Sequence, residues 1–128
     1  MNKFENLEQK RAINAFQACE EKGSFGGVDQ GEVVNKLPPM IRENGMLGAL
    51  AFALSKRDKS DGHDKAFEAV RIHLKSIGKV NADNTTDLQK ELMECSALKL
   101  RDVTAETMLY LDYLRRFAES KDEGKQNE

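Results

Sequence analysis

Residues 37–56 read LPPMIRENGMLGALAFALSK, and this stretch decides the fold. Its second half, Met46–Leu54, carries no charged or strongly polar side chain. The run has less than half of the roughly 20 residues that a bilayer span needs, so a membrane helix is not expected. A helix that is apolar on nearly every side has to be enclosed by other helices. The stretch therefore predicts a central apolar helix over residues 46–55 of a helical bundle.

Two signals upstream of this helix predict breaks in the chain. Pro38 removes a backbone donor and restricts the residue before it, which predicts that one helix ends before Leu37 and another begins at Pro39. Asn44 and Gly45 predict the end of that short second helix, because glycine adopts the left-handed conformation that caps helix carbonyls. We therefore interpret Pro38, Asn44 and Gly45 as structural residues.

Helical periodicity extends over most of the remaining chain. Further helices are predicted over residues 4–19, 29–36, 64–77, 86–93 and about 103–120. The expected N-terminal caps are Asp64, Thr86 and either Asp102 or Thr104, and the expected stop signals are Gly23 and Gly78. The last helix is the longest and carries two apolar stripes, so it has more than one neighbour.

Composition agrees with an all-α protein. Ala, Glu, Lys, Leu and Arg account for 58 of the 128 residues, whereas Val, Ile and Thr account for 14. This balance favours helices over a sandwich, a barrel or a parallel sheet. The length suits one domain. We expect a compact single-domain bundle of about five to six helices over residues 1–120, with residues 121–128 as a polar, frayed tail.

Few residues suggest chemistry. Cys19 and Cys95 lack the spacing of a zinc site, and His63 and His73 have no partner at metal-ligand spacing. No acid–base pair or activated nucleophile is evident, so the chain is not expected to be an enzyme or to need a cofactor or metal. The first residues, Met1–Glu5, lack the pattern of a secretory signal. We interpret both cysteines as buried thiols, which stay reduced in the cytoplasm. These two observations together predict a cytoplasmic protein.

Charge is unevenly distributed along the chain. The net charge is −2. Residues 1–32 carry 4 cations and 6 anions, residues 33–79 carry 9 and 5, and residues 80–128 carry 7 and 11. The basic clusters are Lys56, Arg57 and Lys59 in one loop, Arg71 and Lys75 a helical turn apart, and Arg115 with Arg116. Such clusters either hold phosphates or form an ordinary solvated surface.

Two segments resemble a known family. Residues 37–56 resemble its pattern Leu-Pro…Ile-x-x-Asn-Gly-Leu…Leu-Ala-Phe…Lys, with Met46 in place of the leucine after Asn-Gly. Residues 110–118, YLDYLRRFA, are similar to its closing Tyr-Leu-x-x-Leu-Arg-Arg-Phe-Ala helix, which includes Phe117. The family is the small subunit of the Cmr complex (the fifth Cmr protein) of type III-B CRISPR RNA-guided effectors.

The resemblance implies a small helical protein without a catalytic centre, acting in antiviral defence. Copies would stack on one another beside the backbone subunits that hold the guide RNA, lining the groove for the target RNA. The implied partners are other Cmr subunits, neighbouring copies and the RNA backbone. The candidate contact residues are Arg42, Lys56, Arg57, Lys59, Arg115 and Arg116. The alternative is a helical adaptor that binds only protein, which the acidic balance and the doubly apolar last helix favour.

Overall fold

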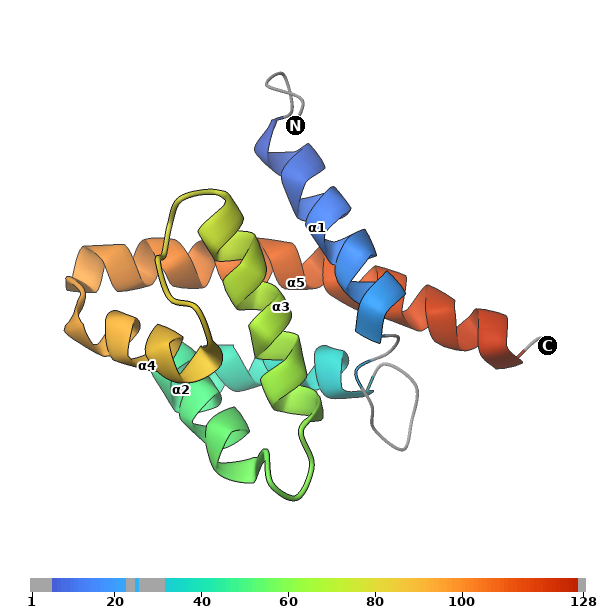
Figure 1. Cartoon of the computed structure of the whole chain (residues 1–128), viewed down its shortest axis with the longest axis horizontal. Helices are drawn as coiled ribbons and strands as arrows, with labels where there is room; N and C mark the ends of the chain where they lie inside the picture. Colours follow the sequence, from blue (N-terminus) through green and yellow to red (C-terminus); the bar gives the residue numbers. More distant parts are fainter. Residues whose placement is uncertain (1–5, 23–24, 26–31, 127–128) are drawn as a thin grey trace.

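The computed structural model describes residues 6–22, 25 and 32–126, and these residues form helices and no strand (Figure 1). The helices are α1 (Leu7–Lys22), α2 (Glu32–Lys56), α3 (Gly62–Ser76), α4 (Thr85–Glu94) and α5 (Ala97–Gln126). The predicted all-α class and the long C-terminal helix are confirmed. The expectations that concern residues 4, 5, 23 and 29–31 lie outside the described residues.

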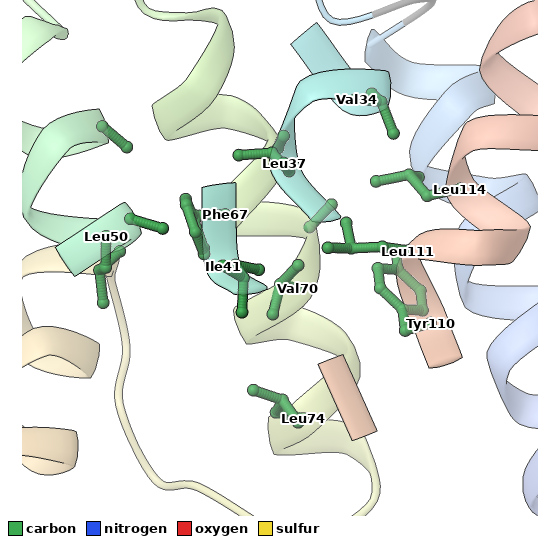
Figure 2. Packing of buried hydrophobic residues seen from close by; sticks show 14 of the residues in the cluster. Val34, Leu37, Ile41, Leu50, Phe67, Val70, Leu74, Tyr110, Leu111 and Leu114 are labelled. Atoms are coloured by element: carbon green, nitrogen blue, oxygen red, sulfur yellow. The ribbon is translucent and has the colours of Figure 1, made fainter. Parts of the chain in front are cut away.

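The helices cross one another rather than lying in parallel. Helix α5 runs along the length of the molecule, and α1 and α3 cross it at steep angles (Figure 1). Helix α3 contacts each of the other four helices. Its side chains Phe67, Val70 and Leu74 are fully buried in the core shown in Figure 2. The same core receives Val34, Leu37, Ile41 and Leu50 from α2 and Tyr110, Leu111 and Leu114 from α5.

The predicted break at Pro38 is wrong. Helix α2 continues through Pro38 and Pro39 with helical backbone angles. Each proline removes one backbone hydrogen bond from the helix. The continuous helix nevertheless keeps Val34, Leu37 and Ile41 on one buried face, whereas Pro39 lies on the exposed side. Burial of that apolar face outweighs the lost hydrogen bonds, because each fully buried aliphatic side chain contributes about 1.5–3 kcal/mol.

The predicted interruption at Gly45 is confirmed. Its backbone angles are φ 79° and ψ 163°, which lie outside the helical region and divide α2 into two segments at a kink. This combination of angles is accessible almost only to glycine. Asn44, the residue before it, is exposed. The kink sets the direction of the second segment, which contains the apolar run.

The apolar run is buried on one face only. Met46, Ala49, Leu50 and Ala53 are in the core, but Phe52 is exposed. The prediction of a helix enclosed on every side is therefore wrong for this outer face, because α2 packs against α3, α4 and α5 from one side. Helix α3 occupies the position that the sequence suggested for residues 46–55.

The predicted N-terminal caps of α3 and α4 are wrong. Helix α3 begins at Gly62, and Asp64 instead accepts a hydrogen bond from the Thr85 hydroxyl at 2.7 Å. The cap of α4 is Asn84, whose side chain accepts from the backbone N–H of Asp87 at 2.8 Å, and not Thr86. Asparagine is among the best capping residues, so α4 begins nearer the loop than the apolar periodicity suggests.

The beginning of α5 shows the same shift. Ser96 Oγ accepts from the backbone N–H of Lys99 at 3.0 Å, so the helix begins at Ala97 instead of at Asp102 or Thr104. Asp102 pairs with Lys79 at 2.7 Å. At its other end, the helix continues to Gln126, past the end predicted near residue 120.

The predicted stop at Gly78 is confirmed. Gly78 has φ 77°, and the backbone N–H groups of Gly78 and Lys79 donate to the carbonyls of Lys75 and Leu74. These two bonds form the Schellman motif that ends many helices.

Helix α1 is attached to the far half of α5. Phe16 meets Phe117 edge to face, with 5.6 Å between ring centroids. Tyr113 donates its hydroxyl hydrogen to Glu8 at 2.8 Å, and this bond raises the pKa of Tyr113. The aromatic residues of the last helix thus serve packing between α1 and α5. Within the described part of the chain, no helix is both long and apolar enough to cross a membrane.

Candidate nucleic-acid interface

A groove between the first half of α2 and the middle of α5 brings two of the predicted contact residues together. Arg42 comes from α2 and Arg115 from α5, 73 positions further along the chain. The groove has a volume of about 510 Å³. It is lined by Asn35, Pro38, Pro39, Arg42, Met108, Leu109, Asp112 and Arg115. Guanidinium groups therefore stand beside a partly apolar floor.

The packing of the two helices creates this groove. Ile41 and Leu111 point into the core, so the next residues along each helix, Arg42 and Asp112, are turned towards solvent. Pro39 and Leu109 lie on the same outward sides and are exposed. Arg42 has no carboxylate partner within 4 Å among the described residues, so its guanidinium group is available to an external anion.

Arg115 and Arg116 share one carboxylate. Arg115 Nη2 lies 2.9 Å from Asp112 Oδ1, and Arg116 Nε lies 3.6 Å from Asp112 Oδ2. Both ion pairs form within α5, at spacings of three and four residues. The exposed side-chain fractions are 36% for Arg115, 67% for Arg116 and 51% for Asp112. Only Arg115 lines the groove, because consecutive helix positions point about 100° apart.

Lys56, Arg57 and Lys59 lie at the other end of α2 and in the turn that follows it. Lys56 Nζ lies 5.2 Å from the centre of the Phe52 ring, and Arg57 donates to the Thr86 hydroxyl at 3.2 Å. Lys59 is exposed. These three residues lie beyond the kink at Gly45 and none of them lines the groove, so the loop and the groove are two basic sites.

The remaining cations of the basic middle third include two that are neutralised within the fold. Arg71 donates to Glu68 at 2.8 Å and to the backbone carbonyl of Ala82 at 2.8 Å. Lys75 forms an ion pair with Asp83 and holds the pKa of that carboxyl below its usual value. The cluster of Arg71 and Lys75 that the sequence suggests is therefore not an available basic patch.

A buried polar cluster joins α1, α3 and α5. Arg11 donates to both carboxylate oxygens of Glu106, at 2.8 and 2.7 Å. His73 also bonds Glu106, at 2.8 Å, and its ring stacks on Tyr110 with 4.4 Å between centroids. Asn14 Nδ2 lies 2.8 Å from the other ring nitrogen of His73. Sequence reasoning missed this cluster, because its partners are 33 to 95 positions apart and no local motif marks them.

Protonation of this cluster follows from its burial. Burial lowers the pKa of His73, against the opposing effect of the Glu106 hydrogen bond. Burial also acts to raise the pKa of Glu106, but the hydrogen bonds from Arg11 and His73 together outweigh it, and the pKa lies below its usual value. A charged Glu106 and a neutral His73 result. Because His73 and Glu106 are buried, the cluster joins α1, α3 and α5 inside the fold.

No three His, Cys, Asp or Glu side chains among the described residues are grouped so as to hold a metal ion. Cys19 is buried and Cys95 is half-buried, and neither takes part in a disulfide bond. Of the contact residues that the sequence suggests, Arg42 and Arg115 line the groove, Arg116 lies beside Arg115, and residues 56, 57 and 59 lie at the end of α2 and in the turn after it.

Comparison with known proteins agrees with this fold. A crystal structure of a CRISPR-associated Cmr5 family protein from Thermus thermophilus superposes with a TM-score of 0.70 at 22% sequence identity. The match covers 91% of this chain and 98% of that one. The family model described as CRISPR-associated protein (Cas_Cmr5) matches residues 7–121, which is nearly all of the described chain. The chain therefore belongs to the Cmr5 family, the small subunits of Cmr CRISPR complexes.

Proposed function

We propose that the chain is a non-catalytic small subunit that lines the target-RNA groove of a type III-B CRISPR effector complex in the cytoplasm. In this role it stacks in several copies beside the subunits that hold the guide RNA and contributes to antiviral defence. Base pairing reads the target sequence in RNA-guided complexes, so the protein needs to hold only the backbone and the shape of the duplex.

The observation that supports this proposal most is the groove between α2 and α5. Its two guanidinium groups, from Arg42 and Arg115, stand on separate helices at one opening. A guanidinium group donates several N–H bonds in a fixed geometry that suits phosphate. Two such groups per copy give modest affinity, and several copies in a row add their contacts. A subunit with net charge −2 can therefore assist RNA binding within an assembly.

An adaptor that contacts only other protein subunits is the second candidate. The groove contains a carboxylate, Asp112, and an apolar floor that includes the exposed Leu109. Such a mixed lining suits a peptide segment as well as a nucleic acid. In this alternative Arg42 and Arg115 bind acidic side chains of a neighbouring subunit, and RNA affinity is independent of them.

The test measures target-RNA binding by assembled Cmr complexes that carry charge-reversed small subunits. Arg42→Glu with Arg115→Glu tests the groove, and Lys56→Glu with Arg57→Glu tests the loop. Each pair is expected to weaken RNA binding and to make it less dependent on salt, because each lost phosphate contact reduces the slope by about 0.7–0.9. Lys90→Glu, an exposed lysine on α4, is the control and is expected to change little.

Copurification with the other subunits separates the two candidates. If the groove variants assemble normally but bind RNA as tightly as the wild type at every salt concentration, the RNA-lining role of the groove is wrong. If they no longer copurify with the complex, the protein adaptor is the better description.

A further inference from the structure

Asp112 is an unexpected residue for a site that binds phosphate. It lines the same groove as Arg42 and Arg115, and its carboxylate lies within 4 Å of two guanidinium groups. A phosphate that approaches Arg115 meets this negative charge at the same place. The three side chains of the Arg115–Asp112–Arg116 cluster carry a net charge of only about +1 at neutral pH.

Asp112 pairs with Arg115 and Arg116 without fixing their positions. Each arginine makes one contact with it, at 2.9 and 3.6 Å, and not the two parallel bonds of a bidentate pair. All three side chains are at least about a third exposed. Exposed ion pairs of this kind contribute little free energy, so a phosphate can displace the carboxylate. Such a pair weakens anion binding slightly and does not abolish it.

Contrast with the buried cluster supports this assignment. Glu106 holds Arg11 through two bonds, at 2.7 and 2.8 Å, in a site almost closed to solvent. That arrangement fixes a side chain in the fold. Asp112 does nothing comparable, because both of its contacts come from its own helix at i+3 and i+4 and join no second element. Its structural contribution is therefore small, and its main effect is on the charge of the groove.

We infer that Asp112 is a built-in competitor of RNA phosphates for Arg115, one that lowers the affinity of each single copy for RNA. This inference rests on the proposed function of the groove. A weak single copy does not hold RNA outside the complex. In a row of copies the low affinity of each copy for RNA is overcome, because contacts made by neighbouring copies raise the local concentration of phosphate at every groove. Dependence of RNA binding on assembly is the consequence.

The experiment compares target-RNA affinity of complexes assembled with Asp112→Asn, Arg115→Gln, or both substitutions. Asp112→Asn is expected to tighten binding about two- to fivefold per copy, the range of an exposed ion pair. Asp102→Asn is a matched control: it removes the same charge from the same helix, 52% exposed and also paired with a cation, at a point about 15 Å away. The control is expected to change RNA affinity less than about twofold.

The double variant distinguishes competition from general repulsion. Competition predicts that Arg115→Gln weakens binding by a larger factor in the Asp112→Asn background than in the wild type, because Arg115 is then fully available. Equal factors in both backgrounds, or weaker binding by Asp112→Asn alone, would overturn the inference. In the second outcome Asp112 orients Arg115 towards RNA instead of competing for it.

The proposed function and this inference fail in different ways. If Arg42→Gln and Arg115→Gln both leave RNA affinity unchanged, the groove does not bind RNA and the role of Asp112 fails with it. If these variants weaken binding while Asp112→Asn does not tighten it, the groove binds RNA and only the competition is wrong. Thermal unfolding of each subunit, followed by circular dichroism, verifies that the folds are equal.

Discussion

His73 donates its Nε2 hydrogen to Glu106 across 2.8 Å at a place where the ring has no exposed surface and Glu106 is 4% exposed. Asn14 determines which ring nitrogen carries that hydrogen. Its amide nitrogen, which can only donate, lies 2.8 Å from Nδ1, so Nδ1 accepts and the proton is on Nε2. The imidazole is therefore neutral. A second proton, on Nδ1, would place an N–H donor of His73 against the N–H donor of Asn14.

Stability is expected to fall as the pH decreases through the range in which His73 would take up a proton. Burial lowers the pKa of His73 in the folded state below its ordinary value of 6.5. The unfolded chain then binds more protons than the folded one below that pH. The contribution of neutral His73 is complete above about pH 6.5 and is lost as the pH falls through the folded-state pKa. Urea unfolding at about pH 7.5, 6.5 and 5.5 measures this loss.

His73→Gln is the control for that pH dependence. It keeps hydrogen-bonding groups but cannot titrate, so it is expected to lower stability by about 1–3 kcal/mol and to flatten the dependence between about pH 7.5 and 5.5. A wild-type midpoint that stays constant over this range would contradict the assignment of a neutral, buried His73.

Arg11→Met removes the bidentate partner of Glu106. A buried carboxylate that loses its partner typically costs about 3 kcal/mol or more, and this loss is expected in full at about pH 7.5. Arg11 also helps to lower the pKa of His73, so in the variant His73 takes up a proton more readily. The variant is therefore expected to regain part of the lost stability at mildly acidic pH, where a protonated His73 pairs with the charged Glu106. Denaturant unfolding at both pH values tests this. Lys10→Met should change stability by less than about 0.5 kcal/mol.

Gly45→Ala tests the kink in α2. No atom lies within 4 Å of an added methyl group, so the cost is confined to the backbone angles. These angles are expected to cost an alanine about 1–3 kcal/mol. Gly48→Ala, three positions further on in regular helix, meets only the Asn44 Cβ at 3.1 Å. It should stay within about 1 kcal/mol of the wild type. Equal thermal midpoints for the two variants would mean that an alanine adopts the backbone angles of Gly45 without a cost in stability.

Pro39→Ala is expected to stabilise the protein. The substitution restores a backbone donor inside α2, and the exposed ring leaves no cavity behind. A proline inside a helix costs about 3 kcal/mol of stability relative to alanine. Proline also lowers the entropy of the unfolded chain, which offsets about 0.4–1 kcal/mol of this cost. A net gain of about 2 kcal/mol should appear as a higher thermal midpoint. A lower midpoint would contradict this expectation and show that Pro39 stabilises the fold.

The helical class and most helix positions follow from local patterns. The apolar spacing of Phe67, Val70 and Leu74 and the glycine at 78 define α3 almost completely. Local patterns misplace the helix beginnings, because Asn84 and Ser96 outcompete the later candidates Thr86 and Asp102. The break expected at Pro38 is wrong because tertiary burial of Leu37 overrides the local preference of proline.

The groove can be anticipated only in part. Arg42 and Arg115 are recognisable as candidate cations, but their meeting in one groove depends on how α2 crosses α5, which no local pattern encodes. The pairing of Arg115 with Asp112 is predictable, since residues three apart on a helix are neighbours. The cluster of Arg11, His73 and Glu106 is not, because its members come from three helices.

Polar side chains on α1 that bond other helices recur every three residues. Glu8 bonds Tyr113, Arg11 bonds Glu106, and Asn14 bonds His73. Helices held only by apolar contacts can slide by a turn at little cost. A shift of α1 by one turn, about 5.4 Å, would instead leave the charged Glu106 buried without its ion-pair partner. The alignment of the first helix is thus dictated by charge, and sequences that keep its apolar face while losing Arg11 should dock it in several registers.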